Sequence, residues 1–414
     1  MPEASVPTIA EIERAQQRLS TLAQVTPLES SSYLSGLLGA PVHLKCENLQ
    51  RTGSFKIRGA FNRLAMLTDE EKARGVVAAS AGNHAQGVAL AARELGIAAT
   101  IYMPVGVALP KLQATRAYGA EVVLEGNAVD DALKAADAFA ARTGAVMIHP
   151  FDHPDVIAGQ GTLGLEIYQQ LPDVSTVVVA IGGGGLIAGV ALAIKQRAAA
   201  DGRTVRVIGV QAANAAAYPP SLQRGEPTEI TLAPTIADGI AVGKPGAAPF
   251  AIIRDLVDEV VTVDDDATAT ALLSLLEHAK LVVEPAGAVG VAAIQAGLVA
   301  SDGPAVVLLS GGNIDPLMME RIVSHGLAAS GRYLKIRIPL PDRPGQLART
   351  SAIVAEANAN VVEVLHTRHG SGLQISQVEL ELHIETRGPA HSELVLSRLR
   401  EAGYEPRVVS AEPS

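Results

Sequence analysis

One lysine, Lys56, lies between a phenylalanine and an isoleucine in the stretch TGSFKIRGA, shortly after a Gly-Ser turn. Apolar surroundings disfavour the charged form of a lysine and lower its pKa. A neutral amine attacks aldehydes, so a lysine in this setting is suited to imine formation. Because most lysines lie on the surface and do no chemistry, Lys56 acquires a chemical meaning only from the residues that accompany it.

A glycine-rich loop could hold a phosphate. The stretch AIGGGGLIAG runs from a β-rich segment into a helical pattern, so its N–H groups would lie at a helix N-terminus, where anions bind. The loop glycines are Gly182, Gly183, Gly184 and Gly185. With Ala188 they also fit a dinucleotide fingerprint, but Gln211 replaces its ribose-binding acid, and Leu186 stands where a Walker motif needs lysine. We therefore favour a phosphate without a nucleotide, although a tight turn without a ligand would show the same glycines.

Two further polar loops are expected at strand ends. In SAGNHAQG, Asn83 and His84 could hydrogen-bond a small ligand, or Ser80 and Asn83 could simply cap a helix. In LLSGGN, Ser310 could offer its hydroxyl to a ligand or only form a turn. Ligands of open α/β sheets bind beyond the carboxyl ends of the strands. A lysine, a phosphate loop, an amide and a hydroxyl at that edge together match pyridoxal phosphate.

The elements that must position these loops alternate regularly. From about residue 75, short β-rich runs such as VVAAS and ATIYMP are separated by helical stretches, and the rhythm continues through TVVVAI to AVVLLSGG. Strand, helix and strand at this spacing predict βαβ units and a parallel sheet, and continuous apolar strands predict helices on both faces. We expect an α/β fold in which residues 1 to about 325 form a doubly wound unit of two lobes, the small lobe being inserted at about 55–150.

The pattern changes after the small-residue stretch SHGLAASGR, which we interpret as a linker at about 326–332. YLKIRIPL, VVEVLHTRH and SQVELELHIE alternate with period two, as half-buried strands do. Helical patterns follow the first and third of them, and YEPRVVS is a last strand. Residues 333–414 are therefore predicted to form a ferredoxin-like βαββαβ module.

The composition narrows the class of protein. The 414 residues are too many for one core, and 48% hydrophobic against 18% charged residues argues against disorder. A net charge of −10 without a basic patch excludes nucleic acid as an expected partner. The single cysteine, Cys46, fits a reducing compartment and is expected to be packing. We expect no signal peptide and no membrane span, and hence a cytoplasmic protein.

Four motifs in this order and spacing resemble a known family. ENLQRTGSFKIRGA, SAGNHAQG, GGGGL and LLSGGN are similar to the motifs of threonine dehydratases, or threonine ammonia-lyases, which belong to the tryptophan-synthase-β-like, fold-type II group of pyridoxal phosphate enzymes. The resemblance covers about residues 5–325. The remainder, with DRPGQL at its first strand-to-helix turn, resembles an ACT regulatory domain, so the whole is similar to the single-ACT form of the family.

The resemblance implies a role for each loop. Lys56 would bind the cofactor aldehyde covalently, Asn83 would contact its phenolic oxygen, and Ser310 would contact its pyridine nitrogen. Glu284, in VEPAGA, is similar to the family's acid near the cofactor ring, although it could also only begin a helix. The phosphate would be held by the backbone of Gly182, Gly183, Gly184, Gly185 and Leu186. The substrate carboxylate would be received by Ser80, Ala81, Gly82, Asn83 and His84.

The implied reaction is the conversion of L-threonine to 2-oxobutanoate and ammonia, with L-serine converted more weakly to pyruvate. Lys56, once displaced by the substrate amine, would remove the Cα proton before the β-hydroxyl leaves. A hydroxyl at the ring nitrogen, unlike a carboxylate, need not keep that nitrogen protonated. We therefore hypothesise that Ser310 makes the carbanion short-lived and favours elimination over racemisation.

The main alternative is a serine or threonine racemase, which shares all four motifs. Racemases have a second serine where this sequence has Ala81, which cannot carry a proton, so dehydration is favoured. Some relatives bind a divalent metal through acids where Gln211 and Ala217 stand here, so we predict no divalent metal, while a monovalent cation on backbone carbonyls stays open. Threonine synthase, cysteine synthase, a non-enzymatic amino-acid sensor and a nicotinamide dehydrogenase are weaker alternatives.

The resemblance also suggests how the enzyme is regulated. ACT domains usually pair between subunits and bind amino acids at the interface, and the family makes isoleucine or valine the expected effector. A homotetramer and a role in isoleucine biosynthesis are suggested in the same way. The sequence alone leaves a catabolic role open.

Overall fold

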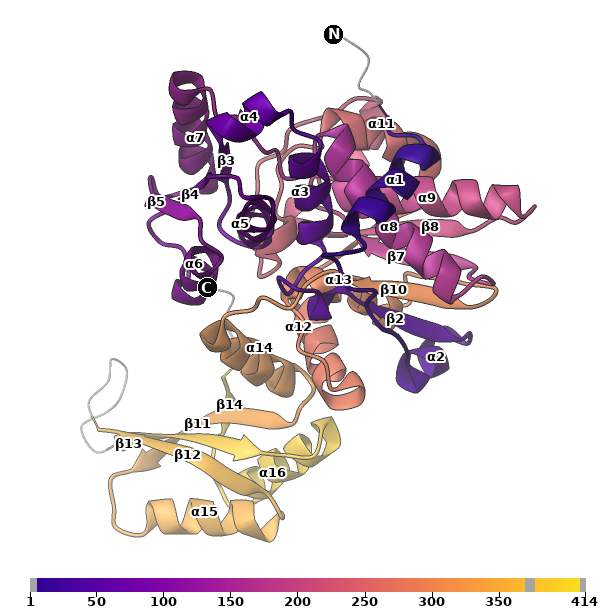
Figure 1. Cartoon of the computed structure of the whole chain (residues 1–414). Helices are drawn as coiled ribbons and strands as arrows, with labels where there is room; N and C mark the ends of the chain where they lie inside the picture. Colours follow the sequence, from indigo (N-terminus) through magenta and orange to yellow (C-terminus); the bar gives the residue numbers. More distant parts are fainter. Residues whose placement is uncertain (1–5, 369–376, 410–414) are drawn as a thin grey trace. The chain divides into compact units, whose positions relative to one another are not determined.

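The structure is a computed structural model that describes residues 6–368 and 377–409 (Figure 1). It divides into two compact units, Met1–Asp315 and Pro316–Ser414. The first, which we call the catalytic unit, contains two sheets, and the second, the C-terminal unit, contains one. No helix in the described ranges is long and apolar enough to cross a membrane.

The larger sheet of the catalytic unit has the strand order β1-β2-β10-β7-β8-β9. All neighbours are parallel except β1, which pairs antiparallel with β2. The strands are β1 (Leu28–Ser30), β2 (Val42–Cys46), β7 (Thr176–Ala180), β8 (Arg206–Ala212), β9 (Glu259–Val263) and β10 (Ala305–Leu309). Cys46 is fully buried, and burial raises the pKa of its thiol to about 12, which agrees with a packing role.

The smaller sheet has the order β5-β4-β3-β6 and is entirely parallel. Its strands are β3 (Val76–Ala79), β4 (Ala99–Met103), β5 (Glu121–Leu124) and β6 (Val146–Met147). The residues of β3 alternate: Val76 and Ala78 pack in one apolar cluster with α5 (Asn83–Leu95), whereas Val77 and Ala79 pack in another with α7 (Val129–Thr143). This double covering confirms the predicted α/β fold, with the small lobe inserted between β2 and β7.

Helices also cover both faces of the larger sheet. On one face β7 and β10 share an apolar core with α1 (Ile9–Leu19), α8 (Pro154–Gln170), α9 (Gly185–Ala200) and α11 (Ala247–Leu256). On the other face lies α13 (Pro285–Gln295), where Gly290 approaches side chains of β7 and β10. The remaining helices are α2 (Ser32–Leu38), α3 (Lys56–Ala65), α4 (Asp69–Arg74), α6 (Leu109–Ala117), α10 (Tyr218–Arg224) and α12 (Asp265–Ser274), the last continued by a π-helical turn at Leu275–Ala279.

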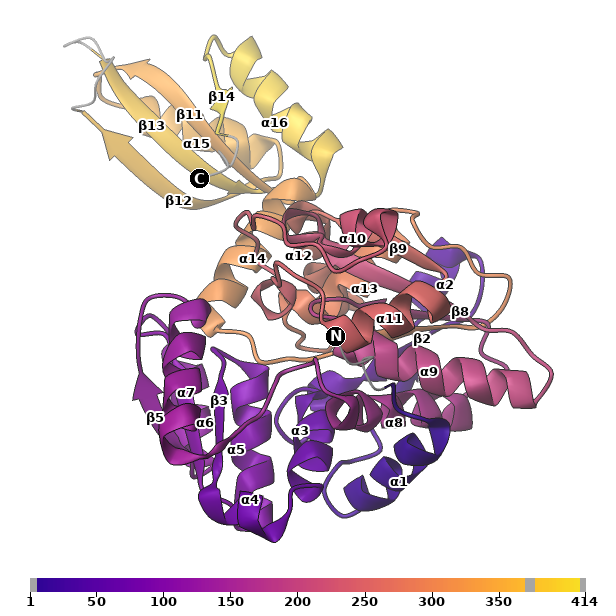
Figure 2. The same ribbon diagram turned by 90° about the horizontal axis from the view of Figure 1, so that it is seen from above.

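The lobes meet where α3 packs against both α5 and α8, as the two views show (Figures 1 and 2). Small residues allow the close approach of α3 and α8. A Cβ on Gly159 of α8 would lie 2.5 Å from the carbonyl oxygen of Arg58. Each predicted ligand loop follows the carboxyl end of a parallel strand, namely β2, β3, β7 or β10.

The C-terminal unit contains α14 (Pro316–Ala329), β11 (Tyr333–Pro341), α15 (Gln346–Glu356), β12 (Asn360–Thr367), β13 (Gln377–Glu385), α16 (Pro389–Glu401) and β14 (Arg407–Val408). Its sheet is antiparallel with the order β12-β13-β11-β14. Strand, helix, two strands, helix and strand in this order form the βαββαβ arrangement that the alternating pattern predicts.

The structure differs from the expected linker at 326–332. Helix α14 continues through Ala329, and the compact catalytic unit ends at Asp315. Residues 324–329 are helical because they continue the helix that begins with PLMMERIV: Ile322 and, four residues later, Gly326 are both buried on it. Only the last residues turn, at Gly331, whose φ of +67° favours glycine.

Candidate active site

Lys56 is the first residue of α3, and its backbone is fixed on two sides. The N–H of Phe55 donates to the carbonyl oxygen of Ser310 over 3.1 Å, and Ser54 forms an isolated bridge with Gly311. On the other side, a Cβ on Gly87 of α5 would lie 3.1 Å from the carbonyl carbon of Lys56. The structure therefore brings three of the predicted loops together at the start of α3.

The Lys56 ammonium lies among few polar groups. Its Nζ donates to the carbonyl oxygen of Pro150 over 3.0 Å and lies 5.2 Å from the centre of the Phe55 ring. Burial lowers the pKa of Lys56 to about 8, and Glu284 opposes this effect by favouring the charged form. A substantial fraction of the amine is therefore neutral slightly above neutral pH, as a nucleophile and base requires.

The glycine loop connects β7 to α9 without room for side chains. Gly184 has a φ of +98°, in the left-handed region that favours glycine. A Cβ on Gly183 would lie 2.4 Å from the Phe151 ring, and one on Gly184 would lie 2.0 Å from the Tyr218 hydroxyl. The loop is held by its carbonyls, since Gly183 accepts from the Tyr218 hydroxyl over 3.2 Å and from the Gly246 N–H over 3.1 Å.

The amides of the same loop remain available. No hydrogen bond among the described residues uses an N–H of Gly182, Gly183, Gly184, Gly185 or Leu186 as donor. Unpaired amides at the N-terminus of a 16-residue helix form a cradle for an anion. The loop therefore fits the phosphate of pyridoxal phosphate.

Asn83 lies in a chain of hydrogen bonds that crosses three loops. Its Nδ2 donates to Glu284 Oε1 over 2.6 Å, and its Oδ1 accepts from Asn313 Nδ2 over 2.8 Å. Asn313 Nδ2 also donates to the carbonyl oxygen of Thr52 over 2.7 Å. These contacts fix the orientation of the Asn83 amide, which keeps one N–H for a further acceptor. The motif LLSGGN contains Asn313, but nothing in the sequence indicates that Asn313 meets Asn83.

Glu284 is buried, with 4% of its surface exposed, and precedes α13. Burial raises its pKa to about 7, and Asp238 adds to the effect, while the hydrogen bond from Asn83 opposes it. Near neutral pH this carboxyl can therefore hold or release a proton. Ser310, at the end of β10, is also buried, and its carbonyl contact with Phe55 places it beside Lys56.

The loop from Ser80 to His84 contributes its backbone to the site. His84 is buried, its Nε2 donates to the carbonyl oxygen of Ile148 over 2.8 Å, and burial together with Lys56 lowers its pKa to about 3. The imidazole is thus neutral and engaged away from solvent. Among the described hydrogen bonds, the amides of Ala81, Asn83 and His84 are not donors, whereas the N–H of Gly82 donates to Ser80 Oγ. The free amides can receive a carboxylate.

Three residues near the site were not singled out from the sequence. Phe151 lies under the glycine loop, and Tyr218 supports it from the other side. His149 packs edge-on against Phe151, and its Nδ1 accepts from the N–H of Asp152 over 2.8 Å. Burial lowers the pKa of His149. None of them belongs to a recognisable motif, because each acts only through a loop remote in the sequence.

An amide, Gln211, lies near the end of β8. Gln211 is buried, its Nε2 donates to the carbonyl oxygen of Ala215 over 3.3 Å, and its Oε1 accepts from the N–H of Tyr218 over 2.9 Å. Ala217 is buried beside it. Within residues 6–368 and 377–409, no group of three or more His, Cys, Asp or Glu residues is arranged to hold a metal ion.

Comparisons with known proteins show the family to which the chain belongs. Residues 19–311 match the model of the family described as pyridoxal-phosphate dependent enzyme. The chain is 50% identical over 402 residues to an L-threonine ammonia-lyase of Thermotoga maritima, which covers 97% of this chain and 99% of that protein. The solved structure of threonine deaminase isoform 2 from Solanum lycopersicum matches with a TM-score of 0.72 and 35% identity, covering 78% of this chain and 98% of that one.

A racemase is similar as well. The structure of maize serine racemase matches with a TM-score of 0.71 and 35% identity, covering 78% of this chain and 99% of that one. It fits only the alternative function, because its identity to this chain is lower than that of the ammonia-lyase, which also spans the C-terminal unit. The chain belongs to the pyridoxal-phosphate-dependent enzyme family, and within it to the L-threonine ammonia-lyases.

Proposed function

We propose that Lys56 is the residue through which this L-threonine ammonia-lyase binds pyridoxal phosphate and moves the substrate's Cα proton. The observation that carries the proposal is the setting of Lys56, whose pKa is lowered to about 8. Its Nζ donates to Pro150, the neighbour of the Phe151 that packs under the glycine loop, and its charge is favoured by Glu284, the partner of Asn83. The reaction converts L-threonine to 2-oxobutanoate and ammonia. L-Serine, which lacks the methyl group, would give pyruvate.

We assign each residue of the site a role in binding the cofactor, binding the substrate or moving the proton. Pyridoxal phosphate, when bound, supplies an aldehyde and an electron-withdrawing ring that stabilises negative charge at Cα. The backbone from Gly182 to Leu186 would hold its phosphate, Ser310 its ring nitrogen and Asn83 its phenolic oxygen. Lys56 Nζ, neutral once the substrate amine has taken its place, would accept the Cα proton. The free amides of Ala81, Asn83 and His84 would orient the substrate carboxylate.

Elimination is favoured over racemisation by what lies on either side of Cα. Racemisation needs a second group that returns a proton to the face opposite Lys56, and Ala81 has no group that can do this.

The raised pKa of Glu284, about 7, gives the site a group that can exchange a proton near neutral pH. We propose that Glu284 tunes the charge at the ring through Asn83.

Borohydride trapping tests the assignment of Lys56. The cofactor-loaded protein is reduced, digested and mapped by mass spectrometry, and we expect the adduct on the peptide that contains Lys56. Lys45, which is fully buried and bonded to Glu166, serves as the internal control and should stay unmodified. Lys56→Ala should bind the cofactor without a reducible bond and release ammonia from threonine at least about 1,000-fold more slowly. An adduct on another lysine would refute the proposal.

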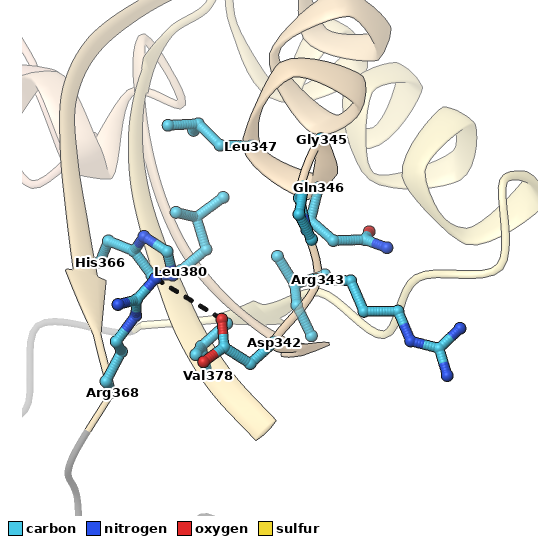
Figure 3. A pocket seen from close by; sticks show the side chains of 11 residues that line it. Asp342, Arg343, Gly345, Gln346, Leu347, His366, Arg368, Val378 and Leu380 are labelled. Carbon is cyan, nitrogen blue, oxygen red and sulfur yellow. Dashed lines mark ion pairs between the residues drawn. The ribbon is translucent and has the colours of Figure 1, made fainter. Parts of the chain in front are cut away.

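We further propose that the C-terminal unit is an ACT regulatory domain that binds a branched-chain amino acid. A cavity of about 260 Å³ lies between the turn after β11 and the end of β12 (Figure 3). Asp342 and Arg368, both in its lining, form an ion pair in which Oδ1 and Nη2 are 3.6 Å apart. Leu340, Leu347, Val378 and Leu380 supply an apolar lining. A carboxylate for an ammonium, a guanidinium for a carboxylate and an apolar wall suit isoleucine or valine.

Steady-state kinetics with both amino acids tests the regulatory proposal. We expect isoleucine or valine to shift the threonine saturation curve of the wild-type enzyme, and Arg368→Met to abolish the shift with basal turnover unchanged. Arg398→Met, on the exposed face of α16 and 3.9 Å from Glu401, is the matched control and should respond like the wild type. A response that survives in Arg368→Met would place the effector elsewhere.

A homotetramer paired through the C-terminal units is part of the same proposal. Strand β12 is one of the two edge strands of the described sheet, and Val362, Val364 and Leu365 are exposed on it. An exposed apolar edge strand is a surface that another strand can join. Sedimentation of the purified enzyme should give four times the mass of one chain.

A further inference from the structure

An ion pair joins the two lobes beside the loop that we assign to the substrate carboxylate. Lys111 lies in the first turn of α6, in the small lobe (Figure 1), and Asp238 begins a short 3₁₀ turn of the large lobe. Lys111 Nζ lies 2.8 Å from Asp238 Oδ2. Lys111 and Asp238 are 127 residues apart in the sequence, and neither lies in the four motifs described in the sequence analysis.

The ammonium of Lys111 faces the bare side of this loop. A Cβ on Gly82 would lie 3.9 Å from Lys111 Nζ, and the next atom that it would meet is Cδ of the same lysine, at 4.0 Å. On either side of Gly82 are the amides of Ala81 and Asn83, which are not donors in any hydrogen bond of the described residues. Two amides without an acceptor and an ammonium thus lie around Gly82, and groups of these kinds bind carboxylates.

The two partners of the ion pair differ in exposure. The Lys111 side chain is 18% exposed, whereas that of Asp238 is 62% exposed. A mostly buried ammonium needs a partner, but an exposed carboxylate can return to water at little cost. A substrate carboxylate that enters the space could therefore replace Asp238 without leaving any charge both buried and unpaired.

We propose that Lys111 is a specificity-determining residue that recognises the α-carboxylate of the amino-acid substrate, and that Asp238 holds its ammonium until the substrate arrives. The inference rests on the proposed function, since it takes the loop from Ser80 to His84 as the carboxylate site. Because Lys111 and Asp238 belong to different lobes, the exchange also links substrate binding to the contact between the lobes.

Lys111→Met tests the proposal by its effect on acid and amide forms of one ligand. We expect the KM for L-threonine to rise about 10- to 100-fold with kcat changed less than about threefold, as for the loss of a charge-assisted hydrogen bond in binding. The competitive inhibition constant of L-threoninamide, which lacks the charge, should stay within about twofold of the wild type. The preference for the acid over the amide should therefore collapse, and Lys111→Arg should restore most of it.

Lys195→Met is the matched control, because Lys195 Nζ lies 2.6 Å from Asp258 in an ion pair of the same unit and of similar exposure. It should leave the acid–amide preference unchanged. Asp238→Asn should keep or lower the KM for threonine, since the ammonium loses a competitor.

Three results would overturn the proposal. The first is a Lys111→Met variant that keeps the wild-type preference for threonine over threoninamide. The second is a Lys195→Met variant that loses this preference to the same extent. The third is a KM for threonine that Asp238→Asn raises as much as Lys111→Met, which would mean that the ion pair only holds the two lobes together. Borohydride trapping separates this failure from that of the proposed function. If Lys56 carries the adduct and Lys111→Met keeps the acid–amide preference, only the role proposed for Lys111 is refuted.

Discussion

Two groups of charged residues differ in how many of their members reach water. In the catalytic unit, Lys45, Glu47, Arg58 and Glu166 form what we call the buried ion cluster, whose side chains are at most 7% exposed. In the C-terminal unit, one face of the sheet carries what we call the open charge row, formed by Lys335, Arg337, Glu363, Glu381 and His383. There Arg337 is 47% and Glu363 55% exposed.

The buried ion cluster is neutral and fully hydrogen-bonded. Arg58 donates through Nε to Glu47 over 2.8 Å and through Nη1 to Glu166 over 2.6 Å, and Lys45 Nζ donates to Glu166 over 2.9 Å. Since four charges have left water, each depends on the others, and removal of one leaves an unpaired charge in the interior. In the open charge row, Glu381 and His383 are buried, but their partners Lys335, Arg337 and Glu363 reach water, so the loss of one of these exposed partners costs little.

The comparison shows that buried ion pairs hold their residues in place more firmly than exposed ones. The buried ion cluster can therefore fix the geometry of the active site. Arg58 and Lys56 are two residues apart on α3, and a helix turns by about 200° over two residues, so their side chains leave on opposite sides. The hydrogen bonds of Arg58 to two carboxylates fix how the first turn of α3 is rotated about the helix axis. Because Lys56 leaves the helix on the side opposite Arg58, the same rotation directs Lys56 into the site.

Arg58→Met should therefore have the largest effect. The substitution leaves two buried carboxylates with one lysine, and we expect the catalytic unit to lose about 3–5 kcal/mol of stability. Urea unfolding of the full-length enzyme, followed in the catalytic unit, measures the loss. Arg93→Met is the control, because Arg93 is 48% exposed beside Glu94 and should cost less than about 1 kcal/mol. Equal losses in the two variants would mean that burial does not distinguish the groups.

Much of the fold and the centre of the site could be predicted from the sequence. The apolar runs and helical stretches indicate the βαβ units, and α9, Gly185–Ala200, is the helix expected after the glycine loop. Lys56 and the glycine loop were recognisable because each is a local motif whose chemistry needs only its neighbours in sequence. The end of the catalytic unit was less predictable, since small residues suit both a linker and the helix α14.

The partners of the site residues could not be predicted in the same way. Asn83 meets Glu284 and Asn313, which are 201 and 230 residues away in sequence. The buried ion cluster likewise unites β2, α3 and α8, and its charged residues resemble surface residues in the sequence. Only the packing of the two lobes shows which of these side chains have lost their water.

The second prediction concerns pH in the open charge row. Burial alone would raise the pKa of Glu381, but hydrogen bonds from Lys335, His383 and Arg337 together lower it from 4.5 to about 2. A carboxyl with a lowered pKa stabilises the fold above its ordinary pKa, and the contribution is lost as the pH falls from about 4.5 to about 2. Glu381→Gln should thus cost the C-terminal unit about 1–2 kcal/mol at pH 7 and nothing near pH 2.

Unfolding of the C-terminal unit in the full-length chain, measured over this pH range, checks the prediction. Glu379→Gln is the matched control, because Glu379 lies 3.7 Å from Arg337 and is 31% exposed. It should change stability by less than about 0.5 kcal/mol at any pH. A difference between Glu381→Gln and the wild type that persists at pH 2 would show that the glutamate acts through packing and not through its charge.

Lys335→Met should have the smallest effect, although Lys335 Nζ lies only 2.8 Å from Glu381. The lysine is 36% exposed, and Glu381 keeps hydrogen bonds from Arg337 and His383, so we expect a loss of about 0.5 kcal/mol that shrinks further in 1 M salt. Lys45→Met, whose lysine is fully buried at a similar distance from Glu166, should cost several times more and respond little to salt. Because the two ion pairs have nearly the same length, the ratio of these losses isolates burial from distance. A ratio near one would mean that water reaches the buried ion cluster as freely as it reaches the open charge row.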